Sequence, residues 1–168
     1  MRSKMRLFFT GIKLIFVLTG ALFLFGCKKD KQLPPAPSIE FVSFIETGDS
    51  AYLTIKFVDG DADIGLREYD TVPPYDKDSR YYYNLFLDYY EWDNNEWKYI
   101  ELNPPFYYRI PYLTNQTNKN YLEGEITVTL AAPYYNPFST ASKYKYQIQL
   151  VDRALHESNV VETPELSK

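Results

Sequence analysis

Lys143–Leu150, with the sequence KYKYQIQL, is the stretch that decides the fold. Tyrosine, isoleucine and leucine at every second position alternate with lysine and glutamine, which is the period of a β-strand with one buried face and one wet face. An amphipathic α-helix would need apolar residues every three to four positions, and no window of the chain sustains that period. We therefore expect a protein built from half-buried strands.

The same alternation recurs along the chain at residues 51–58 and 125–131. Two further apolar runs flank Asp93-Asn94-Asn95, whose residues tolerate positive φ, so they predict a hairpin. Seven or eight short strands separated by turns predict an all-β fold, an immunoglobulin-like (cadherin- or fibronectin-type) antiparallel β-sandwich. The expected strands, in chain order, are residues 38–46, 51–58, 81–90, 96–102, 106–110, 125–131, 143–151 and 159–163.

The N-terminus has the layout of a secretory signal, with early basic residues and an apolar run at Leu14–Phe25. As a helix this run would be ~18 Å long, which is short of the ~30 Å hydrocarbon core of a bilayer. Leu24-Phe25-Gly26-Cys27 resembles a lipobox, although Phe25 stands where a small or β-branched residue is usual. Cys27 is the chain's only cysteine and cannot form an internal disulfide, so we predict that it is lipidated. A signal-anchor and an ordinary signal ending in a chance cysteine are the alternatives.

Three regions are therefore expected: a signal peptide at 1–26, a lipidated Cys27 with a flexible Pro-rich tether at 27–37, and the sandwich at 38–168. The net charge is −4, and loss of the signal's four basic side chains would make it −8. Such a charge opposes binding to nucleic acid and to anionic lipid surfaces, so the lipid would hold the protein to the membrane. We expect a cell-envelope protein at the outer membrane, in either leaflet.

Three carboxylates, Asp59, Asp61 and Asp63, directly follow the strand at 51–58. Like charges ~4 Å apart repel by about 4 kcal/mol near a protein surface, so this spacing indicates a bound cation or full solvation. In an immunoglobulin-like sandwich the loop after residues 143–151 emerges at the same end, which adds Asp152 and Glu157. Calcium binds oxygen ligands, so we predict a calcium site at Asp59, Asp61, Asp63 and Asp152, with Glu157 as a further ligand. A solvated turn is the alternative.

The acidic run is not an EF-hand, because its sixth position is Ile64 and its twelfth is Asp70. Asp61–Gly65 instead resembles the Asp-Ala-Asp-x-Gly calcium segment of cadherin-like domains.

A wider resemblance covers nearly the whole chain. Its parts are the lipobox, the Pro-rich tether, FVDGDADIGL, Arg109-Ile110-Pro111, Leu122–Ile126 and the closing IQLVDRALHESNVVETP. Together they resemble a family of small Bacteroidota-type lipoproteins with an immunoglobulin-like domain and a DGDxDIG motif. The resemblance implies an exported, lipid-anchored β-sandwich, and it implies no activity.

The sequence holds few groups for catalysis. His156 and Cys27 are single representatives of their types, which leaves too few ligands for zinc. Asp152, His156 and Ser158 are local neighbours in one loop rather than an assembled triad, and we expect a solvated histidine. We therefore expect no enzyme, with a carboxylate-based hydrolase as the weaker alternative, because the sequence does not give the separations between the acids.

Aromatic residues are abundant, with 17 Tyr, 11 Phe and 2 Trp. One face of the strand at 81–90 is expected to fill the core, and the other is more aromatic than a solvated sheet needs. The protein is thus expected to be a lipid-anchored binding or structural module, with a glycan-binding accessory lipoprotein of a polysaccharide-uptake system, or a protein-binding face, as alternatives. Cross-strand aromatic pairing would also explain this face. The candidate ligand-facing residues are Tyr82, Phe86, Tyr90, Trp92 and Trp97.

Overall fold

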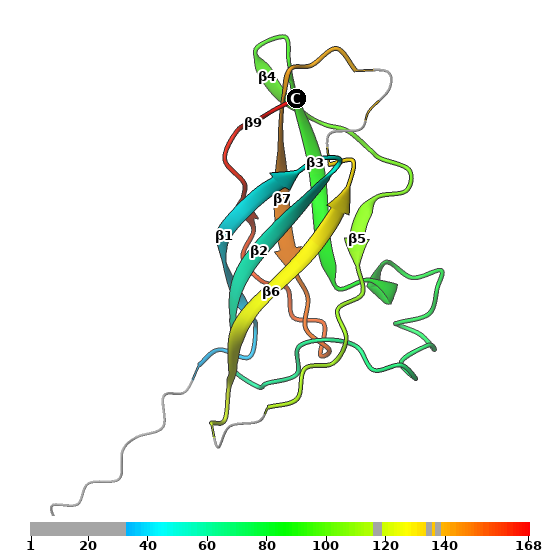
Figure 1. The fold of residues 1–168 in the computed structure, drawn as a ribbon. Coiled ribbons are helices and arrows are strands. Elements are labelled where there is room, and N and C mark those ends of the chain that lie inside the picture. The colour runs from blue at the N-terminus through cyan, green and yellow to red at the C-terminus, as the bar shows by residue number, and fades with distance from the viewer. Residues whose placement is uncertain (1–32, 116–118, 134–135, 137–138) are drawn as a thin grey trace, which may run out of the picture. The chain divides into compact units, whose positions relative to one another are not determined.

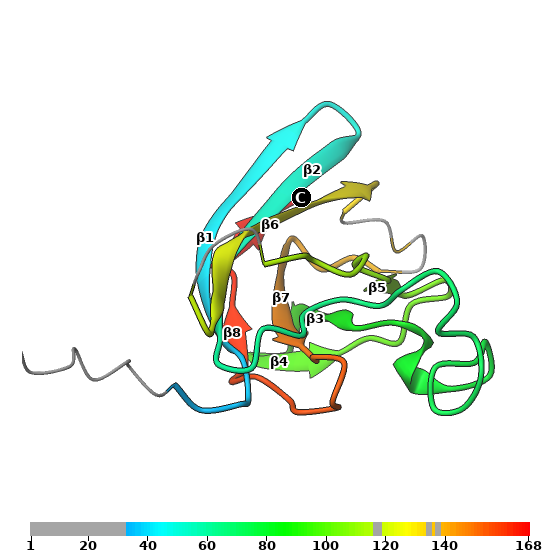
Figure 2. The same ribbon diagram turned by 90° about the horizontal axis from the view of Figure 1, so that it is seen from below.

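The computed structural model describes residues 33–115, 119–133, 136 and 139–168, so the predicted signal peptide, Cys27 and the first part of the tether lie outside the described residues. The described chain is an antiparallel β-sandwich of the immunoglobulin-like type, with two sheets packed face to face (Figures 1 and 2). Within these ranges the one helical turn is the 3-10 segment η1, Arg80–Tyr82, and no helix is long and apolar enough to cross a membrane.

The first sheet has three strands in the order β1-β2-β6. They are β1 (Ser38–Thr47), β2 (Ser50–Asp59) and β6 (Leu122–Ala131). The alternation in β2 puts Leu53, Ile55 and Phe57 into the core, where each is at most 2% exposed. Burial of such side chains contributes ~1.5–3 kcal/mol each, and this fixes the face that β2 turns inward.

The second sheet has the order β4-β3-β7-β8, with β5 paired to β3 and β9 to β7. In β7 the side chains of Tyr144, Tyr146, Ile148 and Leu150 are all 0% exposed, which confirms the inward face predicted from KYKYQIQL. The strands of this sheet are β3 (Leu85–Asp93), β4 (Glu96–Tyr99), β5 (Phe106–Tyr108), β7 (Lys143–Leu150), β8 (Val161–Glu162) and β9 (Leu166–Ser167).

The rings of three tyrosines, Tyr89, Tyr144 and Tyr146, fill much of the core between the two sheets. Their hydroxyl groups are satisfied at the edges of the core: Tyr89 donates to Glu91 Oε1 at 2.8 Å, and Tyr146 donates to the carbonyl of Pro133. A buried tyrosine adds a large apolar ring while its polar end needs a partner, and these contacts supply it.

Several strand boundaries differ from the prediction. The strand expected at 81–90 begins at Leu85, because Ser79 caps η1 by accepting a hydrogen bond from the Tyr81 amide at 3.1 Å. The last predicted strand, 159–163, is shortened to β8 at Val161–Glu162. A further strand that was not predicted, β9, follows Pro164, which lacks the N–H that a ladder continuous with β8 would need. The described ranges therefore contain nine strands rather than the expected seven or eight.

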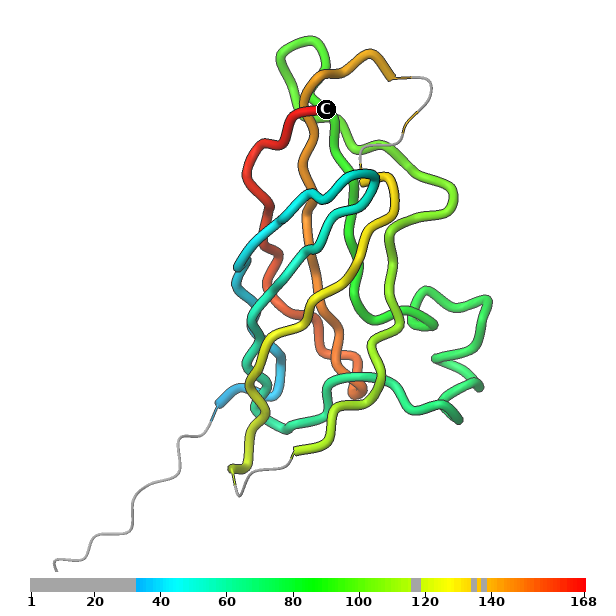
Figure 3. Tube along the Cα trace, viewed as in Figure 1, coloured from blue at the N-terminus to red at the C-terminus, as the bar shows by residue number. Residues whose placement is uncertain are grey.

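The segments that follow β2 and β7 lie at one end of the sandwich, together with the segment that precedes β1 (Figure 3). The Arg153 amide donates to the Asp63 carbonyl at 3.2 Å, which joins the two loops. The backbone of Leu33 and Pro34 lies directly on Gly60, where a Cβ atom would be 2.1 Å from the Pro34 oxygen. The acidic loop is thus held between the entering chain and the loop after β7.

Candidate metal centre

The four carboxylates of the predicted site lie together. Asp59 is the last residue of β2, Asp61 and Asp63 belong to the turn that follows it, and Asp152 comes shortly after β7. Each of the four offers one carboxylate oxygen, and these oxygens all lie within 4.8 Å of one another. Two segments almost ninety residues apart thus contribute to a single cluster of oxygen atoms.

The backbone of the turn holds this arrangement. The Asp63 amide donates to Asp59 Oδ2 at 2.8 Å, and Ala62 adopts a φ of +60°, which curls the chain back toward the end of β2. Gly65 ends the turn with a φ of +96°, and a Cβ there would be 2.2 Å from the Pro111 carbonyl oxygen. Only glycine fits this exit, because both its backbone angle and the space beside it exclude a side chain.

Two oxygen atoms of the cluster are buried without a hydrogen-bond partner among the described residues: Asp59 Oδ1 and Asp63 Oδ1. Asp59 itself is 0% exposed. Buried polar atoms almost always find a partner, and a buried carboxylate needs a compensating charge. These two oxygens therefore need a partner from outside the described chain.

The electrostatics of the cluster oppose ionisation. Burial, followed by the charges of neighbouring aspartates, raises the pKa of Asp59 to about 7 and that of Asp63 to about 6. Burial also raises the pKa of Asp152, although hydrogen bonds from His156 oppose the rise. Ionising Asp59, Asp63 and Asp152 in the folded chain alone therefore costs free energy, and a bound divalent cation would stabilise the ionised carboxylates.

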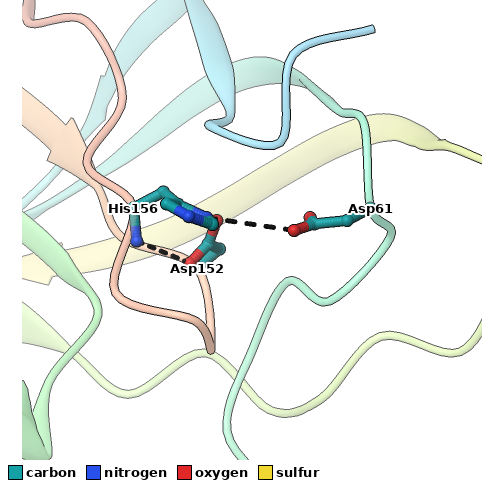
Figure 4. Close-up of side chains that lie close together, drawn as sticks. All are labelled: Asp61, Asp152 and His156. Carbon is teal, nitrogen blue, oxygen red and sulfur yellow. Dashed lines mark hydrogen bonds and ion pairs between the residues drawn. The ribbon is translucent and has the colours of Figure 1, made fainter. Parts of the chain in front are cut away.

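His156 lies beside the cluster (Figure 4). Its Nδ1 is 2.9 Å from Asp152 Oδ2 and 3.8 Å from Asp61 Oδ2, and its amide donates to Asp152 Oδ1 at 2.8 Å. The hydrogen bond and negative charge of Asp152 raise the pKa of His156. The interpretation of His156 as a freely solvated loop residue missed this contact, and its spacing of four residues from Asp152 is the signal that could have indicated it.

Two neighbouring residues do not join the cluster. Glu157, expected as a further ligand, is exposed and accepts a hydrogen bond from Gln149 Nε2 at 3.3 Å. The Ser158 hydroxyl accepts from the Leu150 amide at 3.0 Å and donates to the Asn159 carbonyl at 2.7 Å, so it has a structural role in the loop. Glu157 belongs to neither group of candidate metal ligands among the described residues, so the structure does not bring it into the cluster.

A second layer of charged contacts supports the site. Arg153 makes a bidentate ion pair with Asp70, with both nitrogen–oxygen distances at 3.0 Å, and its carbonyl accepts from the Tyr75 hydroxyl. Arg109 donates to the carbonyls of Tyr82 and Asp70, both at 2.7 Å. These contacts fasten the long segment between β2 and β3 beside the acidic turn, because a guanidinium can bind several oxygen atoms at once.

Three of the five candidate ligand-facing aromatics make cross-strand contacts between β3 and β4. Trp92 and Trp97 are opposite residues on β3 and β4, and their rings meet edge to face with centroids 5.2 Å apart. Tyr90 meets Tyr99 at 5.7 Å, and Lys145 Nζ lies 5.0 Å from the Trp97 ring. This is the cross-strand pairing that the sequence left open as an alternative.

Two of the five candidates lie apart from this group. Phe86 is only 2% exposed, since Arg80 covers its ring at 4.7 Å and Tyr107 packs against it at 5.1 Å. Tyr82 belongs to η1 and lies under the guanidinium of Arg109 at 4.9 Å. Phe86 therefore cannot present its ring to a ligand, and the proposed face is smaller than expected.

Comparison with known proteins gives little further information. No protein-family model matches the chain, and no curated protein matches it. A solved structure with a detectable similarity is the glycoside hydrolase domain of Endo-D from Streptococcus pneumoniae, at 13% identity and a TM-score of 0.27. The match covers 82% of this chain but only 16% of that one, and no argument about function rests on it.

Proposed function

We propose that the protein is a lipid-anchored, extracytoplasmic binding or structural module whose immunoglobulin-like domain is stabilised by calcium and has no catalytic activity. The observation that carries the proposal is the cluster formed by Asp59, Asp61, Asp63 and Asp152, each of which offers one oxygen within 4.8 Å of the others. In this cluster Asp59 Oδ1 and Asp63 Oδ1 are buried without a hydrogen-bond partner among the described residues. A cation at this point would satisfy both oxygens and oppose the mutual repulsion of the carboxylates.

The donor set favours calcium over other divalent ions. All four residues offer carboxylate oxygens, from the end of β2, the turn after it and the loop after β7. Calcium accepts six to eight oxygen ligands in irregular geometry. Magnesium demands a near-ideal octahedron, and zinc prefers nitrogen and sulfur. A second group, Asp61, Asp152 and His156, includes one nitrogen donor, but its Nδ1 already lies within hydrogen-bond distance of Asp152.

A structural role for the ion follows from its position. The acidic turn touches the entering chain at Gly60 and the loop after β7 at Arg153. An ion bound there would fasten three segments at one end of the sandwich. It would stiffen the end of the domain that adjoins the N-terminal tether, while the lipid proposed for Cys27 would attach the chain to the membrane.

Thermal unfolding of the full chain in detergent, with chelator and with millimolar calcium, tests the proposal. We expect calcium to raise the melting temperature by several degrees, since each kcal/mol of stability corresponds to ~2–4 °C in a domain of this size. Asp59→Asn should remove most of this rise. In chelator the same variant should melt at or above the temperature of the unchanged protein, because it loses the repulsion but keeps an oxygen for the Asp63 amide.

The matched control is Glu68→Gln, which removes an exposed charge from the segment that follows the acidic turn. It should keep the full calcium response. An equal melting temperature with chelator and with calcium would refute the proposed ion. A larger response to zinc than to calcium would instead assign the site to the group that contains His156.

A further inference from the structure

A hollow opens on the outer face of the second sheet, between β4 and β5. Both strands pair with the same edge of β3: β4 along Tyr90–Asp93 and β5 along Leu85–Leu87. Between them the chain leaves the sheet over residues 101–105 and returns. The resulting hollow has a volume of about 570 Å³. Its lining consists of Tyr99, Glu101, Leu102, Asn103, Pro105 and Tyr107.

The aromatic and polar groups of the hollow are held in place. Tyr99 is 49% exposed, and its ring is supported from one side by Tyr90 at 5.7 Å. The Tyr107 hydroxyl donates to Asp88 Oδ1 at 3.0 Å, which fixes the ring at the back of the hollow. Glu101 and Asn103 are exposed on the intervening segment. Two fixed rings are thus combined with a carboxylate and an amide on the bridging segment.

This combination matches the chemistry of a sugar. An aromatic face carries negative charge density and packs against polarised C–H groups, while carboxylate and amide groups exchange hydrogen bonds with hydroxyls. None of the described residues that line the hollow is cationic, and Asp88 behind Tyr107 adds another acid. An anionic ligand would therefore be repelled. The volume lies within the range usual for small-molecule sites.

We propose that this hollow binds a neutral carbohydrate, with Tyr99 as the stacking platform and Glu101 and Asn103 as hydrogen-bonding groups. The lining of this hollow includes none of the residues of the face expected from the sequence, which were Tyr82, Phe86, Tyr90, Trp92 and Trp97. The hollow uses no group of the acidic cluster. The strands that flank it, β4 and β5, lie away from the end of the sandwich at which β1 begins (Figure 1).

An oligosaccharide array, probed with the labelled full chain in detergent, tests this proposal with neutral, uronic-acid and sulfated glycans as separate arms. We expect binding to members of the neutral arm alone. Calorimetric titration of a bound oligosaccharide should then show a loss of affinity of about tenfold or more in Tyr99→Ala and a smaller loss in Glu101→Gln. The titration is made in calcium and in chelator below both melting temperatures, and we expect the affinity to be the same in both.

The matched control is Tyr52→Ala, which removes a strand tyrosine of similar exposure, 44%, from the opposite sheet. This variant should keep full affinity. The proposal is overturned if no neutral glycan binds, if the acidic arms bind instead, or if Tyr99→Ala and Tyr52→Ala bind equally well. The titration in chelator measures sugar binding without calcium. The sugar-binding result can therefore be interpreted even if the calcium proposal fails.

Discussion

At the scale of single residues, Asp59 links the stability of the fold to pH. Its pKa is about 7 in the folded chain against 3.8 when unfolded, so between these values the folded state binds more protons. Stability in chelator should therefore fall as the pH rises through this range. Asp63, with a pKa of about 6, and His156, with a raised pKa, act in the same direction. We expect the melting temperature in chelator to decline from about pH 5 to pH 7.

Calcium should flatten this decline, because a bound cation stabilises the ionised carboxylates and lowers their pKa values. Asp70 affects stability in the opposite direction, because the hydrogen bonds from Arg153 lower its pKa. Its contribution to stability is lost only at a pH below the range from 5 to 7. Melting curves recorded by circular dichroism across this range, with and without chelator, measure the effect. A melting temperature in chelator that rises toward neutral pH would contradict it.

At the scale of elements, the turn after β2 depends on Gly65. Its φ of +96° and the 2.2 Å approach of the Pro111 oxygen both exclude a Cβ, whereas Gly48 in the β1–β2 turn has a φ of +57° and open space around it. We expect Gly48→Ala to cost roughly 1–2 kcal/mol from its backbone angle alone. Gly65→Ala should cost clearly more and should weaken the calcium response. Urea unfolding of both variants measures the difference, and equal losses would show that the contact with Pro111 is unimportant.

The alternation of polar and apolar residues sufficed to predict which residues of β2 and β7 face inward. A shift of either strand by one residue would turn all of its apolar side chains to solvent, so only one register buries them. The expected immunoglobulin-like topology predicted that Asp59 and Asp152 would lie close together, since strand direction determines which loops share an end. It did not predict that Arg80 and Tyr107 cover Phe86, or the hollow beside Tyr99. The cover of Phe86 depends on how η1 and β5 approach β3, and the hollow depends on where the chain leaves the sheet after β4. No periodicity specifies either path.

At the scale of the whole molecule, the proposed anchor can be tested at Cys27, which lies outside the described residues. In a bacterial host that carries out lipoprotein processing, the chain should incorporate a palmitate analogue and partition into the detergent phase. Cys27→Ser should lose both properties while the calcium-dependent melting temperature stays unchanged. If the variant still partitions into detergent, the apolar run before Cys27 remains attached and acts as a signal-anchor instead.

The tryptophan pair also has a practical consequence. Trp92 and Trp97 are the chain's two tryptophans, and both belong to the β3–β4 hairpin, at the opposite end of the sandwich from the acidic turn. Indole emission therefore reports on this hairpin alone, whereas the tyrosines lie both in the core and at the surface. Spectroscopic titrations of the two ends can be read separately in the unmodified protein, without attaching a dye: a change in tryptophan emission marks an event near the hairpin, and metal added at the far end should leave it nearly constant.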